Sequence, residues 1–151
     1  KRANVNLNRN AFPKINVNTL EAFPVPNIPK DTQDKIILLV DKLLTSTTKF
    51  YKYISKFISL VKDNLEVPKF SKKLDAFYEL DFKGFLSELK KQKVTLSLSD
   101  QSEWKDYFEE NKLQINQLKS EIEKTDKEID QMVYELYGLT KEEIEIIETT
   151  K

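Results

Sequence analysis

The chain has 151 residues, 39% of them hydrophobic and 33% charged, and its 25 basic and 25 acidic residues give a formal net charge of zero. This composition, with only 2 Gly, is typical of one domain of long exposed helices and not of a compact α/β enzyme. The absence of Cys and His excludes disulfides and thiol nucleophiles, and it removes the commonest general base and metal ligand.

The sequence also lacks features that would direct the chain into or across a membrane. Its longest unbroken aliphatic run is Ile36–Val40, whereas a membrane-spanning helix needs about 20 apolar residues. No apolar core follows the basic residues of the opening KRANVNLNRN, so no signal peptide is predicted. We therefore expect a cytoplasmic protein with no membrane partner. Because the chain begins without Met, we also expect it to be part of a longer protein.

The charges are unevenly distributed along the chain. Residues 1–73 hold 14 basic and 6 acidic residues, a net of +8, while residues 74–151 hold 11 and 19, a net of −8. Two interpretations remain open. The two halves could pair with each other, as oppositely charged helices do, or the basic half could meet nucleic acid.

Residues 1–30 form the first predicted unit. Asn and Pro recur in this segment, which predicts irregular structure, with short strands at residues 4–7 and 14–17 where apolar and polar residues alternate. The second unit, residues 31–151, is predicted to be helical. It opens with a helix of about Thr32–Asn64, in which apolar residues recur at steps of three and four. The hydroxyl residues 45–47 lower helix propensity locally and leave room for a kink or break.

An insert is predicted at residues 66–102. Ser71 can cap a helix of Lys72 to about Lys91, and the following KVTLSLSD is expected as a short strand or an extended loop. Asp100 and Glu103 have the spacing of a capping box for a third helix, which runs to about Tyr137.

Gly138 is predicted to end the third helix as a left-handed C-cap. Thr140 and Glu143 then form a capping box for a final helix through Ile147. The two long helices have similar lengths and flank the insert, so the economical arrangement is antiparallel. The predicted fold class is therefore mainly α: an antiparallel, coiled-coil-like long-helix hairpin with a helical insert and a small irregular or β N-terminal segment.

The sequence contains no motif for catalysis. It has no GxGxxG, P-loop or HExxH pattern, and its acidic clusters belong to charged helical surfaces with Lys neighbours, so we expect neither catalytic residues nor a metal site. Trp104, Tyr107 and Phe108 could stack on nucleic-acid bases, but packing against the second helix is the favoured interpretation.

Basic residues give the only candidate binding site. Arg and Lys in loops and along helices hold phosphates, and loop Arg reads base edges. An ordinary solvated surface is the alternative. The candidate DNA-binding residues are Arg2, Arg9, Lys14, Lys49, Lys52 and Lys56.

Three stretches together resemble a known family. They are FPKINVNTLEAFPVPNIP, LDAFYELDFKGFLSELKKQKVTLSLSDQSEWKDYFEENK and EIDQMVYELYGLTKEEIEIIE. The sequence resembles the C-terminal target-recognition or specificity region of type IIG-like restriction-modification enzymes, which are fused N6-adenine DNA methyltransferase-endonucleases. The last stretch is the most specific of the three.

The resemblance implies a parent protein that uses S-adenosylmethionine and Mg²⁺. This chain holds no Asn-Pro-Pro-Tyr methylation motif and no nuclease residue set, so it is expected to be non-catalytic and to need no cofactor itself. It would position double-stranded DNA for the methyltransferase and nuclease domains of the same protein. The alternative is a coiled-coil protein-protein scaffold without DNA contact, and a homodimer through the helices remains open.

Overall fold

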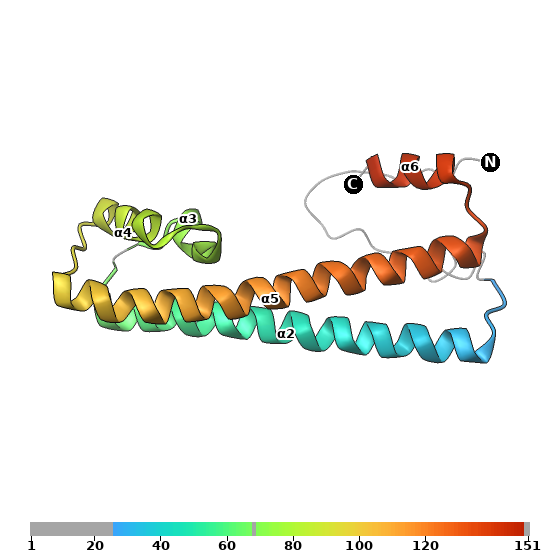
Figure 1. The fold of residues 1–151 in the computed structure, drawn as a ribbon, viewed down its shortest axis with the longest axis horizontal. Coiled ribbons are helices and arrows are strands. Elements are labelled where there is room, and N and C mark those ends of the chain that lie inside the picture. Colours follow the sequence, from blue (N-terminus) through green and yellow to red (C-terminus); the bar gives the residue numbers. More distant parts are fainter. Residues whose placement is uncertain (1–25, 68, 150–151) are drawn as a thin grey trace, which may run out of the picture.

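The computed structural model describes residues 26–67 and 69–149 (Figure 1). Most of the predicted N-terminal unit, residues 1–25, therefore lies outside the described residues. The helices are α2 (Lys30–Leu65), α3 (Lys72–Asp75), the short 3-10 helix η1 (Phe77–Glu79), α4 (Phe82–Lys91), α5 (Leu98–Tyr137) and α6 (Lys141–Thr149). No β-strand occurs in the described ranges, so the mainly α fold class is confirmed for them.

The two long helices, α2 and α5, form the predicted antiparallel hairpin (Figure 1). The insert connects them at one end, and the chain enters α2 and leaves α5 at the other. The helices lie closest at the insert end and diverge toward the end where α2 begins. The buried residues of α2 are Ser46, near its middle, and Phe57 and Val61 in its second half, so apolar packing holds the pair together in that second half.

Aromatic rings fill the core between the insert and the hairpin. Phe57 of α2 stacks on Phe77 of η1, with 3.7 Å between ring centroids, and lies edge-on to Phe85 of α4. Phe108 of α5 contacts Phe85 at 5.1 Å, and all four rings are fully buried. Burial of each ring contributes about 1.5–3 kcal/mol. This cluster fixes the insert onto the hairpin.

Polar contacts reinforce the same junction. Lys112 and Asn116 of α5 donate to the backbone carbonyls of Leu80 and Tyr78, at 2.7 and 3.0 Å. Lys119 forms an ion pair with Glu79 at 3.3 Å. The donors lie on one flank of α5 because their spacing is four and three residues, so these contacts hold the insert against that flank.

The prediction of one continuous second helix from Lys72 to about Lys91 is wrong. Its residues form α3, η1 and α4, because the side chain of Asp81 accepts a hydrogen bond from the Gly84 N–H at 2.7 Å and starts a new helix. The break lets Phe77 and Phe85 enter the same core.

The start of the third helix and the continuity of the first long helix differ from the expectations. The stretch KVTLSLSD forms no strand: of the two expected alternatives the loop is confirmed, for residues 94–97, and α5 begins at Leu98 within the stretch. Ser97, not Asp100, is the N-cap, and Asp100 supplies the second half of its capping box. Helix α2 also continues unbroken through residues 45–47.

The predicted stop after the third helix is confirmed. Gly138 has a φ of 62° and caps α5 in the left-handed region. Thr140 and Glu143 form the expected capping box at the start of α6. Helix α6 turns back beside the end of α5 (Figure 1), where the Tyr134 hydroxyl donates to Glu148 at 3.3 Å.

Candidate functional site

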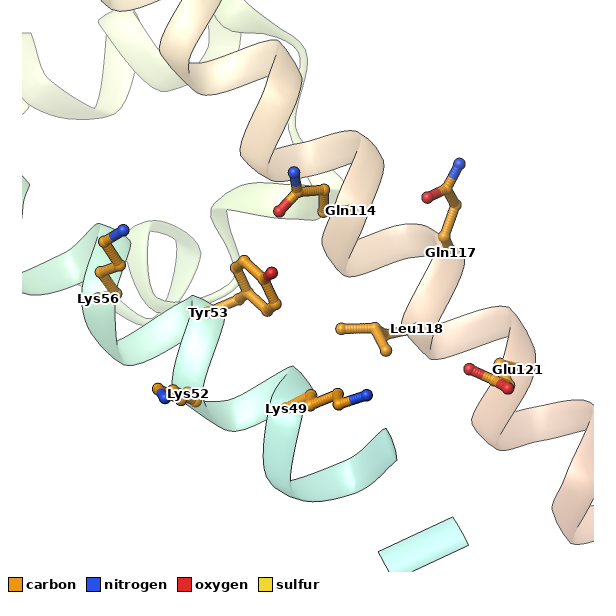
Figure 2. Close-up of a pocket in the computed structure, with 8 residues that line it drawn as sticks. All are labelled: Lys49, Lys52, Tyr53, Lys56, Gln114, Gln117, Leu118 and Glu121. Atoms are coloured by element: carbon orange, nitrogen blue, oxygen red, sulfur yellow. The ribbon is translucent and has the colours of Figure 1, made fainter. Parts of the chain in front are cut away.

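A groove between α2 and α5 holds three of the candidate residues predicted from sequence. Figure 2 shows Lys49, Lys52 and Lys56 on the α2 wall of this groove. It encloses about 660 Å³. The other lining residues are Tyr53 of α2 and Gln114, Gln117, Leu118 and Glu121 of α5. We call this the lysine groove.

The sequence of α2 explains why the three lysines share a wall. They are separated by three and four residues, which places them on one helical face. The apolar face of the same helix, with Phe57 and Val61, is buried against the core. The lysines therefore lie beside the buried face and are exposed to solvent.

One end of the lysine groove is closed by an acidic residue with partners. Glu121 forms an ion pair with Lys42 at 3.2 Å and accepts a hydrogen bond from Ser46 at 3.3 Å. The hydrogen bond from Lys42 is the main cause that holds the pKa of Glu121 below its ordinary value. This carboxylate is therefore already paired with Lys42, although the charge of Lys49 also acts on it.

The register of the antiparallel pair places neutral residues opposite Lys49 and Lys56, although Lys49 also lies near enough to Glu121 for its charge to lower the pKa of that carboxyl. Starting from the pair of Lys42 and Glu121, a step of seven residues along each helix leads to Lys49 and Gln114. A second step leads to Lys56 and Tyr107. In the described part of the chain, no carboxylate lies within ion-pair distance of the groove lysines. The groove thus combines a cationic wall with an amide-bearing one.

Three further candidate DNA-binding residues were predicted from the sequence, and the lysine groove contains two residues that were not predicted. Arg2, Arg9 and Lys14 lie outside the described residues. Sequence reasoning did not find Gln114 and Gln117, which form the opposite wall. A seven-residue repeat on α5 carried a signal for Gln114 alone: it reads Glu135, Glu128, Glu121 and then changes to Gln114 and Tyr107.

The aromatic trio at the start of α5 packs only in part as the sequence favoured, because Phe108 packs against the predicted second helix whereas Trp104 and Tyr107 pack against Phe57 of the first long helix. Phe108 is fully buried against α4, Tyr107 stacks parallel to Phe57 at 5.6 Å, and Trp104 lies edge-on to Phe57 at 6.4 Å. Trp104 and Tyr107 remain partly exposed.

Two kinds of feature are absent from residues 26–67 and 69–149. No group of three or more His, Cys, Asp or Glu side chains there could hold a metal ion. None of the helices in these ranges combines the length and the apolar character needed to cross a bilayer.

Fold and groove define an α-helical hairpin with a helical insert and a cationic groove between its long arms. Residues 29–133 match a family described as a domain of unknown function, DUF8810, and the chain belongs to this family. No curated protein and no solved structure gives a significant match. The family description does not connect the chain with restriction-modification enzymes, so that resemblance stays a prediction.

Proposed function

We propose that this chain is a non-catalytic DNA-binding and spacer module of a type II restriction-modification enzyme, in which the lysine groove holds the phosphate backbone. The observation that supports this proposal is the set of three lysines on one wall without carboxylate partners. Lysine side chains favour phosphate oxygens, and such contacts position a protein on DNA without reading its sequence.

The dimensions of the lysine row agree with this role. Lys49 and Lys56 are seven residues apart, or about 10 Å along the helix. One DNA strand carries a phosphate about every 3.4 Å of helix axis, so three lysines can reach up to three phosphates. Gln114 and Gln117 on the other wall can donate to phosphate oxygens or sugars.

The hairpin shape supports the spacer part of the proposal. Chain entry into α2 and chain exit from α5 lie at the same end, so the insert and the groove extend away from that end (Figure 1). Domains attached to the termini would therefore lie together at one end of the rod. S-adenosylmethionine and Mg²⁺ would bind those parts of the parent protein and not this chain.

Salt dependence of DNA binding tests the proposal. Three phosphate contacts give a log-log slope of about −2.7, so affinity falls about 40-fold between 50 and 200 mM salt. In the triple variant Lys49→Gln, Lys52→Gln, Lys56→Gln, the dependence of log affinity on log salt should become shallower by about 2.7. Fluorescence anisotropy with a duplex at several salt concentrations would measure this change. A charge-matched control carries Lys69→Gln, Lys72→Gln and Lys83→Gln on exposed positions outside the groove. Equal duplex affinity of both triple variants and the parent chain would refute the proposal.

A protein-protein scaffold is the second candidate, and a different surface favours it. Ile37, Leu44 and Tyr51 lie seven residues apart on α2 and are 55%, 61% and 62% exposed. Apolar residues repeated at this spacing can form a helix-helix seam. We call these three residues the apolar row.

A further inference from the structure

Helix α2 carries an apolar stripe that is fully buried at only one end of the hairpin. Phe57 and Val61 of this stripe are fully buried near the insert. Steps of seven residues lead back from Phe57 to Leu43 and Ile36, and from Val61 to Val40. These three residues therefore lie on the same helical face as the buried pair, yet each of them remains partly exposed.

Helix α5 has the same pattern. Phe108 and Ile115 are fully buried, and rings of η1 and α4 pack over this part of the hairpin. Steps of seven residues continue the stripe to Ile122, Ile129 and Leu136, which are partly exposed. Helix α6 does not complete a core at this end, because none of its own residues is buried. We call the six partly exposed residues the open stripe: Ile36, Val40, Leu43, Ile122, Ile129 and Leu136.

The first 25 residues of the chain are in a position to reach the open stripe. The two long helices diverge at this end (Figure 1), so they shield each other's stripe only in part. Residues 1–25 join the described chain at the same end, directly before residues 26–29 and α2. Twenty-five extended residues span about 80 Å. Leu43 lies only about 20 Å along α2 from its first residue, so length does not limit the contact.

The composition of residues 1–25 matches the surface around the open stripe. They include eight large apolar residues, among them Phe12 and Phe23, which suit a half-exposed apolar face. They hold 4 basic residues and 1 acidic residue, a net of +3. Residues 121–149, the end of α5 and all of α6, hold 3 basic and 10 acidic residues, a net of −7. Opposite charges on the two segments favour their contact.

We propose that the open stripe is the docking surface for residues 1–25 of the same chain. This segment would do at the open end of the hairpin what the insert does at the other end, where apolar rings cover the stripe. Its basic residues would face the carboxylates of α5 and α6. The lysine groove is not part of this surface, because its three lysines do not belong to the stripe.

The absence of Cys from the chain allows a spin label at one chosen position. A nitroxide would be attached to the full chain at Asn18→Cys, and the methyl groups of Ile, Leu and Val would be isotope-labelled for NMR. We expect the methyl signals of Ile36 and Ile129 to lose most of their intensity to paramagnetic broadening. The signal of Leu98, at the insert end of α5, should keep its intensity. Unchanged signals from the open stripe would overturn the proposal.

Paired substitutions within residues 1–25 test the apolar contact without touching either long helix. In the spin-labelled chain, Phe12→Ser with Phe23→Ser should restore most of the lost intensity, because the apolar area available for burial falls. The matched control, Asn6→Ser with Asn10→Ser, changes two polar residues of the same segment and should leave the broadening in place. Equal broadening in both paired variants would overturn the proposal.

A mixed sample distinguishes the chain's own segment from that of a second copy. Spin-labelled chain without isotopes would be mixed with isotope-labelled chain without the spin label. We expect no broadening of the open stripe in this sample. Broadening as strong as in the doubly labelled chain would show that a second copy supplies the segment, and it would overturn docking within one chain. No nucleic acid is present, so these results are independent of the proposed DNA-binding function.

Discussion

At the scale of single residues, Gly138 shows how one backbone angle ends a 40-residue helix. Its φ of 62° lies in the left-handed region, and an added Cβ would meet no atom within 4 Å. The requirement for glycine is therefore conformational and not steric. This requirement is readable from sequence, because a glycine between two helical patterns is a local signal.

A substitution at this glycine measures that backbone requirement. We expect Gly138→Ala to lower the free energy of unfolding by about 1 kcal/mol, because a left-handed residue with a Cβ is strained. Urea denaturation followed by circular dichroism would measure it. Gly138→Asn, which tolerates this region better, should cost less. Equal stability of the alanine variant and the parent chain would contradict this account.

At the start of α5, the local sequence did not decide which residue is the N-cap. Ser97 and Asp100 are both good N-cap residues, and the capping-box spacing of Asp100 and Glu103 predicted Asp100. In the structure Leu96 is buried in the core, Ser97 follows it directly as the N-cap, and α5 begins at Leu98. The choice between two adequate caps was made by a tertiary contact.

At the scale of elements, Glu88 joins the short helices of the insert. Its carboxylate accepts hydrogen bonds from Ser71, the N-cap of α3, at 3.3 Å and from Lys91 at 2.6 Å. The bond from Lys91 is the main cause that holds the pKa of Glu88 below its ordinary 4.5. The charged form of Glu88 is therefore stabilised in the folded state.

This lowered pKa has a definite consequence for stability. A depressed folded-state pKa gives a contribution that is full above about pH 4.5 and is lost as the pH falls through the folded-state value. Glu88→Gln should therefore be destabilising at pH 7 and progressively less so in acid, as measured by urea denaturation across this range. Glu109→Gln, an exposed position on α5, controls for loss of a negative charge. A stability difference that stays constant with pH would refute the assignment.

Helix α2 illustrates a tertiary contact that overrides propensity. The hydroxyl residues 45–47 did not break it, because Ser46 faces α5 and its hydroxyl donates to Glu121. Thr48 donates back to the carbonyl of Leu44 at 2.8 Å, which keeps its hydroxyl paired within the helix. Weak local preference was thus offset by contacts across the hairpin.

At the scale of the whole molecule, α2 presents three different surfaces. Its buried face packs on the core, the groove lysines lie on one flank, and the apolar row lies exposed elsewhere on the helix. The lysines support the DNA-binding proposal and the apolar row supports the scaffold alternative. The two surfaces share no residue, so mutations can test them separately.

Self-association through the apolar row is the corresponding prediction. We expect Leu44→Glu to weaken any dimer at least tenfold in sedimentation velocity, since a charge would be buried in an apolar seam. Duplex affinity per chain should stay unchanged. Leu113→Glu on α5 is the matched control, because both leucines are 61% exposed. A chain that is monomeric at high concentration, or equal effects of both variants, would exclude this seam.

The sequence by itself determined the two long helices, the insert between them, the glycine stop and the shared face of Lys49, Lys52 and Lys56. Each of these follows from periodicity, capping and chain length, which are properties of neighbouring residues. Only the tertiary structure decided which residues of α5 lie opposite the lysines, namely the amides of Gln114 and Gln117. These depend on the register between helices far apart in sequence, which is set by the aromatic packing around Phe57.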